Sequence, residues 1–146
     1  SRMSLSMDNP VFRAFAFYAA LSILKMFCCT FLTIFKRMTG GIFANQEDCD
    51  FAQVKKPVID EGVERVRRNH LNDIENVIPF VLIGGFYVAL NPSYSAALWH
   101  FRLFFFSRLV HFVSYQLHLQ PFRALAFGVG LLATLSMLWS VISATL

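Results

Sequence analysis

The sequence predicts an all-α integral membrane protein, a bundle of four transmembrane helices. Of its 146 residues, 56% are hydrophobic and only 15% are charged, whereas soluble domains carry about 25% charged residues. The mean hydropathy is +0.53. A spanning helix needs about 20 mostly apolar residues, and four segments reach or approach that length. We expect one domain over residues 1–146, with helices at about 11–37, 63–90, 95–119 and 122–143 and a cytosolic loop at 38–62.

The first helix is apolar on nearly all sides. Pro10 suits a first helical position, and the Asp-Asn pair before it suits a cap. The Gly40-Gly41 pair ends the helix after two basic residues. Lys25 is the exception inside the run. It either meets a polar partner within the bundle or extends its ammonium to the interface.

Basic residues gather around the first connection. They are Lys36, Arg37, Lys55, Lys56, Arg65, Arg67 and Arg68. The second connection, around Asn91-Pro92, carries none. The positive-inside rule therefore places the first and third connections in the cytosol and both termini on the other side. Such basic loops suit anionic lipid or an anionic substrate. No nucleic-acid-binding motif accompanies them.

Three cysteines form no disulfide framework and no metal-ligand spacing, so we expect no metal site. Cys28 and Cys29 suit packing inside the first helix. Cys49 is expected to be more exposed, within the segment NQEDCD. Its acidic neighbours should raise its pKa and make it a poor nucleophile, although modification of this thiol stays open.

The second helix begins with a charged stretch, VERVRRNHLNDIENVIPF, at Val63–Phe80. With Glu64 at zero and 100 degrees per residue, Arg68, Asn72 and Glu75 fall within a sector of about 80 degrees. The opposite side is expected to hold the apolar residues Val66, Leu71, Ile74, Val77 and Ile78. Glu75 lies inside the hydrophobic segment, where a carboxylate usually marks a functional site.

Polar residues in the third and fourth helices extend this pattern. Arg108, His111 and Tyr115 share a helix face of about 60 degrees, which indicates a polar cavity. Arg102 points elsewhere and is expected to reach the interface. Arg123 begins the fourth helix, where it is either a positive-inside anchor or a functional group.

Together these groups suit one kind of ligand. The excess of arginines pairs carboxylates bidentately, and Glu75 can hold an ammonium group. Glutathione carries both kinds of group. An arginine near its sulfur would lower the thiol pKa and yield the nucleophilic thiolate, and an apolar electrophile would arrive from the bilayer.

The same residues carry a family resemblance. The helix-two stretch, FANQEDC at Phe43–Cys49, HFRLF and RLVHFVSY in the third helix and RALAF from Arg123 resemble the membrane-associated eicosanoid and glutathione metabolism (MAPEG) superfamily. Within this superfamily they resemble the microsomal glutathione transferases of type 1. It implies a homotrimer in the endoplasmic reticulum membrane, sometimes also the outer mitochondrial membrane. It also implies glutathione as co-substrate, bound between subunits, without a metal.

The resemblance also assigns roles by matching position. Arg123 corresponds to the catalytic arginine that stabilises the thiolate. Arg37 corresponds to an arginine contributed across the subunit interface. The remaining glutathione contacts correspond to Arg67, Arg68, His70, Asn72, Glu75, His111 and Tyr115.

Several functions stay open. The first is conjugation of glutathione to hydrophobic electrophiles, with glutathione-dependent reduction of lipid hydroperoxides. A prostaglandin E synthase-like isomerase is disfavoured because Ala124 and Phe127 stand where those relatives carry serine and tyrosine, although Asp48 is kept. The link from Tyr115 to Arg123 is also one residue shorter than in relatives. A non-catalytic lipid-binding scaffold is a further alternative, and a channel or carrier explains the buried charges but not the crowded arginines.

Overall fold

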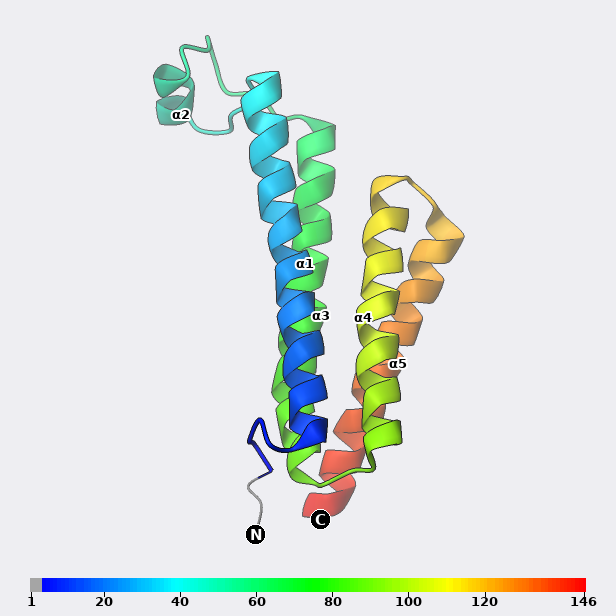
Figure 1. The fold of residues 1–146 in the computed structure, drawn as a ribbon. Coiled ribbons are helices and arrows are strands. Elements are labelled where there is room, and N and C mark those ends of the chain that lie inside the picture. The colour runs from blue at the N-terminus through cyan, green and yellow to red at the C-terminus, as the bar shows by residue number, and fades with distance from the viewer. Residues whose placement is uncertain (1–3) are drawn as a thin grey trace.

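The protein is built from four long helices and one short helix. The computed structural model describes residues 4–146 and contains α1 (Pro10–Gly40), α2 (Gln46–Phe51), α3 (Glu61–Ala89), α4 (Tyr94–Gln116) and α5 (Gln120–Thr145). No strand occurs in this described part. The long helices alternate in direction, and both termini lie at the end opposite α2 (Figure 1). The predicted all-α class is confirmed.

Local sequence signals set the helix ends. The Asn9 side chain accepts a hydrogen bond from the second residue of α1, with Pro10 at the first position. Gly41 adopts a left-handed φ of 62° and closes α1, because glycine takes this conformation without strain. The last residue of α1 is therefore Gly40, three residues beyond the expected end at residue 37. Asp60 and Ser93 cap α3 and α4 in the same way as Asn9.

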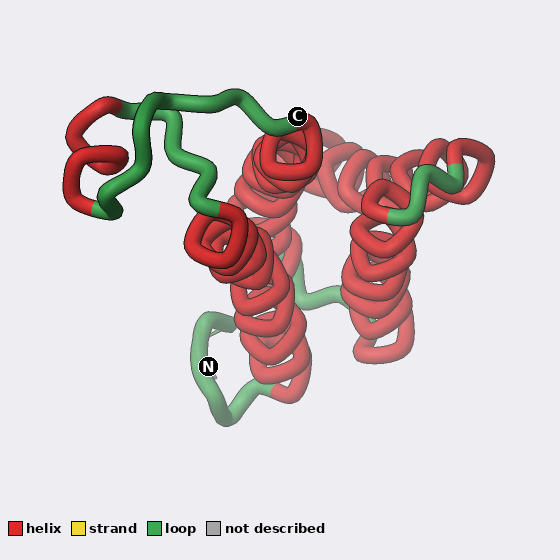
Figure 2. Tube along the Cα trace, turned by 90° about the horizontal axis from the view of Figure 1, so that it is seen from above, coloured by secondary structure: helices red, strands yellow, loops and turns green. Residues whose placement is uncertain are grey.

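Three helices are long and apolar enough to cross a membrane, namely α1, α3 and α5. We expected four. The 23-residue α4 is not among them because its arginines, histidines and serines lower its hydropathy. Viewed from above, α4 nevertheless lies alongside the other long helices (Figure 2), and it contacts α1, α3 and α5.

The loop at 38–62 contains the unexpected helix α2. The acidic residues Glu47 and Asp48 occupy its first turn, where their negative charge interacts favourably with the positive end of the helix dipole. Cys49 is fully buried, which corrects the expectation that this thiol is exposed. Its backbone carbonyl accepts a hydrogen bond from Val54 as the chain folds back.

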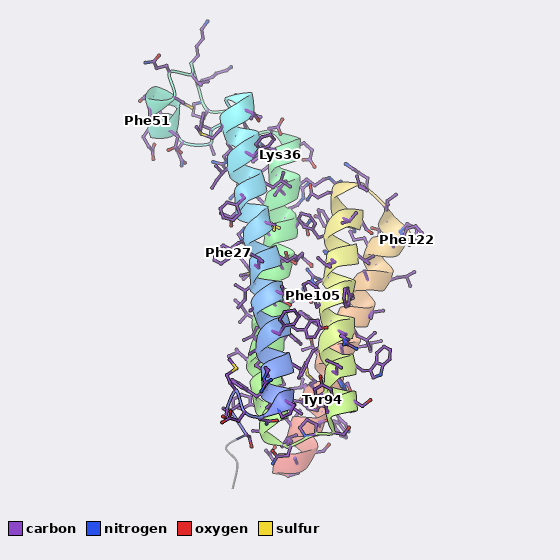
Figure 3. All side chains as sticks on the ribbon, viewed as in Figure 1. Phe27, Lys36, Phe51, Tyr94, Phe105 and Phe122 are labelled. Atoms are coloured by element: carbon purple, nitrogen blue, oxygen red, sulfur yellow. The ribbon has the colours of Figure 1, made fainter. Side chains whose placement is uncertain are left out.

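Aromatic side chains fill the centre of the bundle. The rings of Phe80 and Phe104 stack with their centroids 3.8 Å apart. Phe105 points inward, whereas Phe27 and Phe122 point away from the helices (Figure 3). Gly84 of α3 marks a close contact between helices, because a Cβ there would collide with the ring of Phe15 of α1. A Cβ on the next residue, Gly85, would meet nothing.

Candidate functional site

A buried ionic cluster joins three helices. The Asp73 carboxylate of α3 accepts hydrogen bonds through Oδ1 from Lys25 Nζ at 2.5 Å and from Arg108 Nη2 at 2.7 Å. The exposed fractions are 0% for Asp73, 6% for Lys25 and 1% for Arg108. Cys29 Sγ lies 3.6 Å from Asp73 Oδ2. Lys25 therefore has a polar partner within the bundle, which decides between the two alternatives left open by the sequence.

This cluster corrects the predicted faces of the second helix. Asp73, and not Glu75, is the buried carboxylate, and Glu75 is exposed on the single chain. Val66 and Val77 are buried as expected. The prediction that the apolar residues lie opposite Glu75 was wrong for Leu71, Ile74 and Ile78. These three side chains are exposed, as Glu75 is.

The sequence contained a signal for Asp73. This residue lies about 180 degrees from Glu64 on the helix, within about 40 degrees of the buried valines Val66 and Val77. Lys25 and Arg108 are two cations at membrane depth, and such groups pair with an acidic partner. Asp73 is the acidic residue of α3 on the face that meets both.

A cavity of about 370 Å³ brings four predicted site residues together. They are Asn72 of α3, His111 and Tyr115 of α4, and Arg123 of α5, and Ala124 and Phe127 complete the lining. The Arg123 guanidinium lies 4.9 Å from the centroid of the Tyr115 ring, and the His111 ring lies 5.7 Å from it. The shortened link between α4 and α5 therefore leaves Arg123 within the site.

The ionic cluster fixes the orientation of Asn72. Arg108 Nη2 donates to Asn72 Oδ1 at 2.7 Å as well as to Asp73. Asn76 Nδ2 also approaches Asn72 Oδ1, at 3.5 Å. With Oδ1 occupied, the Nδ2 donors of Asn72 have no partner among residues 4–146. They are available to an acceptor oxygen in the cavity.

Arg65, which the sequence pattern did not single out, contacts one of the residues that line the cavity. Its Nη1 donates to the Tyr115 carbonyl at 2.8 Å, and its guanidinium lies 5.3 Å from the Tyr115 ring centroid. Arg65 and Arg123 thus both contact the same tyrosine. The helical angle of Arg65 is about 100 degrees, next to Asn72 at about 80 degrees, so spacing alone placed it on the same face.

The other predicted residues lie outside this cavity. Arg67, Arg68 and His70 line a second hollow of about 330 Å³ on α3. Arg67 pairs with Glu64 at 2.8 Å, and Arg68 pairs with Glu61. On α1, Arg37 is half-buried and its Nε has no hydrogen-bond partner among the described residues. Glu75 forms no ion pair within residues 4–146. One chain thus assembles four of the nine predicted residues into one cavity.

The fold and this cavity define an all-α membrane protein with a polar cavity that holds one arginine, lined by α3, α4 and α5. The sequence model of the MAPEG family matches residues 15–143. The chain belongs to the MAPEG family, as its motifs predicted.

Individual relatives cover nearly the whole chain. Microsomal glutathione S-transferase 1 of Mus musculus is 47% identical, over 96% of this chain and 94% of the relative. The Homo sapiens protein of the same name is 46% identical with the same coverage. Prostaglandin E synthase of Bos taurus is 35% identical, over 93% of this chain and 90% of the relative.

Proposed function

We propose that the protein is a glutathione transferase that joins the glutathione thiolate to hydrophobic electrophiles at the membrane. The observation that carries this proposal is the cavity in which Arg123 meets Asn72, His111 and Tyr115, on a chain 47% identical to a microsomal glutathione S-transferase. The thiol loses its proton to water, the thiolate forms a bond to the electrophilic carbon, and the leaving group departs with its electron pair.

Arg123 is the proposed catalytic residue. A fixed guanidinium beside the sulfur stabilises the thiolate relative to the thiol and so raises the fraction of nucleophile. The ring of Tyr115 holds Arg123 from one side. The Nδ2 donors of Asn72 bind an oxygen of the peptide, which orients the sulfur toward Arg123.

The complete site is proposed to form between subunits of a homotrimer. Glu75 supports this, because it is exposed on α3 beside apolar residues such as Leu71 and Ile78. An uncovered carboxylate among lipid chains is unfavourable. A second subunit against this face would cover Glu75, which then holds the glutathione ammonium. Arg37 would be supplied across the interface, and the full set of contacts adds Arg67, Arg68 and His70.

All four long helices are proposed to span the membrane, as one four-helix domain. At 1.5 Å per residue, the 23 residues of α4 extend about 35 Å, more than the hydrocarbon thickness of about 30 Å. Its most buried cation, Arg108, is paired inside the protein. We place the protein in the endoplasmic reticulum membrane, and the outer mitochondrial membrane is a second location.

Glutathione-dependent peroxidase activity is proposed for the same cavity. Two glutathione molecules reduce one lipid hydroperoxide to the alcohol and water and become glutathione disulfide. The isomerase alternative has the support of the prostaglandin E synthase relatives, at 35% identity. It is second because Ala124 and Phe127, which line the cavity, offer no hydroxyl group to it.

The test is Arg123→Ala in purified protein at saturating glutathione. Removing one electrostatic stabiliser of this kind lowers the rate by about 10²–10³, and the ultraviolet absorbance of the bound thiolate should disappear. Lys56→Ala, in the exposed part of the loop, is the matched control and should behave as the parent protein. Full conjugation activity in Arg123→Ala would remove the basis of the proposal.

Two further measurements separate the alternatives. Millimolar glutathione should raise the unfolding temperature, because a ligand of the native state stabilises it. No rise would favour the lipid-binding scaffold. Sedimentation in detergent should give a protein mass three times the 16.7 kDa of one chain, and a monomer would contradict the shared site.

A further inference from the structure

Two hollows share Arg102, which lies about 12 Å along α4 from its start at Tyr94, at 1.5 Å per residue. One hollow, of about 380 Å³, lies between α1 and α4 and is lined in part by Arg13, Tyr18, Tyr94 and Arg102. The other, of about 460 Å³, lies between α4 and α5. Arg102 lines both. Arg102 is therefore the residue that a cationic hollow shares with a second hollow of different character.

The cationic hollow holds two arginines without an acidic partner. Arg102 Nε donates to the Tyr18 hydroxyl at 3.0 Å. Arg13 donates through Nε and Nη2 to the Met7 carbonyl at 3.1 and 2.9 Å. Within residues 4–146, neither guanidinium forms an ion pair. Both side chains are exposed on the single chain, and an anionic partner favours a cation at the membrane boundary.

The second hollow is lined almost entirely by apolar side chains. Apart from Arg102 and Ser107, they are aromatic or aliphatic, including Trp99, Phe106 and Val129. On α4 its lining runs from Trp99 to Val110, a length of about 16 Å at 1.5 Å per residue. Half of a hydrocarbon core is about 15 Å thick. The groove is therefore about as long as one acyl chain, and it is centred on the middle of α4.

We propose that Arg13, Arg102 and the α4–α5 groove form a binding site for an anionic phospholipid. The phosphate lies between the two guanidinium groups, with the hydroxyls of Tyr18 and Tyr94 at its edge, and one acyl chain follows the groove. Two guanidinium groups present more donors than one carboxylate can accept, and their geometry suits phosphate oxygens. A phosphodiester is thus favoured over a free fatty acid.

This site is separate from the cavity that holds Arg123. On α5 that cavity is lined by Arg123, Ala124 and Phe127, whereas the groove is lined by other residues of the same helix, such as Leu125 and Val129. The lipid site therefore does not depend on the proposed transferase function.

Lipid binding to the delipidated full chain in neutral detergent tests the proposal. Native mass spectrometry and thermal unfolding would be measured with phosphatidylglycerol, phosphatidylcholine and oleate. We expect phosphatidylglycerol to bind about tenfold or more tightly than the other two, which corresponds to about 1.4 kcal/mol. Equal binding of phosphatidylglycerol and phosphatidylcholine, or tighter binding of oleate, would overturn the proposal.

Variants locate the site. Arg13→Gln with Arg102→Gln should remove the preference for phosphatidylglycerol. The control is Lys55→Gln with Lys56→Gln, which changes the net charge equally at the opposite end of the molecule and should leave the preference intact. Retained preference in the arginine pair variant would overturn the proposal.

A second variant keeps the test decisive if the arginine pair variant does not fold. Val129→Trp fills the groove but retains both arginines. It should lower the binding of phosphatidylglycerol several-fold by excluding the acyl chain. Unchanged binding would show that no chain occupies the groove and would overturn the proposal.

Discussion

Asp73→Asn should be the most damaging single change in the bundle. The carboxylate has no exposed surface and binds Lys25 and Arg108 through the same oxygen. The amide keeps the size of the side chain but leaves both cations buried without a counter-charge. Removing one partner of a buried ion pair costs about 3–5 kcal/mol, and two cations lose their partner here. The folded-to-unfolded ratio should therefore fall by about 10²–10⁴.

Reversible unfolding in mixed micelles with increasing sodium dodecyl sulfate measures this loss. Asp50→Asn, at an exposed position in α2, is the control and should change stability by less than about 0.5 kcal/mol. A midpoint for Asp73→Asn equal to that of the parent protein would refute the reasoning, because the charges would then not depend on one another.

A triple variant separates stability from positioning. Lys25→Met, Asp73→Leu and Arg108→Met replace the cluster by apolar groups, and such exchanges are often neutral or stabilising. Stability should return. Glutathione affinity should not, because Asn72 Oδ1 loses the donor that orients its amide. Recovery of both properties would show that the cluster only holds the helices together.

Three other predictions follow from single contacts. Gly84→Ala should lower stability by about 1–3 kcal/mol in the same assay because of overpacking. Gly85→Ala, with open space around it, should leave stability unchanged or raise it. Equal changes in stability would contradict a close contact at Gly84. Tyr115→Leu should lower kcat/KM for conjugation about 2- to 30-fold more than Tyr115→Phe. The reason is that only leucine removes the ring under Arg123, an interaction of about 0.5–2 kcal/mol. Equal kcat/KM values for the two variants would contradict this role of the ring. Burial and the neighbouring carboxylates raise the pKa of the Cys49 thiol, so iodoacetamide should modify it more slowly at pH 7.5 than a free cysteine and faster as the pH rises; modification at the free rate at pH 7.5 would count against this.

The sequence predicted the long helices well because their apolar runs and caps are local signals. The Asn9 cap, the Gly41 terminus and the family are all confirmed. Periodicity was less reliable for the faces of α3. It places residues around a helix but does not say which side a neighbouring helix covers, so Glu75 was chosen over Asp73.

The candidate site was predictable only in part for a related reason. Asn72, His111, Tyr115 and Arg123 meet within one chain, and spacing or resemblance had selected each of them. Arg65 was passed over because an arginine near a helix start is usually solvated. The burial of Cys49 depends on the path of the loop around α2, which no local pattern in the sequence encodes.

The ion cluster also constrains how the chain enters the membrane during synthesis. Lys25 is made 48 residues before Asp73. At about 5–20 residues per second, its partner follows about 2–10 s later. Through that interval α1 carries an uncompensated ammonium group that opposes release into lipid. The protein is therefore expected to keep α1 at the insertion machinery until α3 arrives, so that α1 and α3 enter the bilayer as a pair.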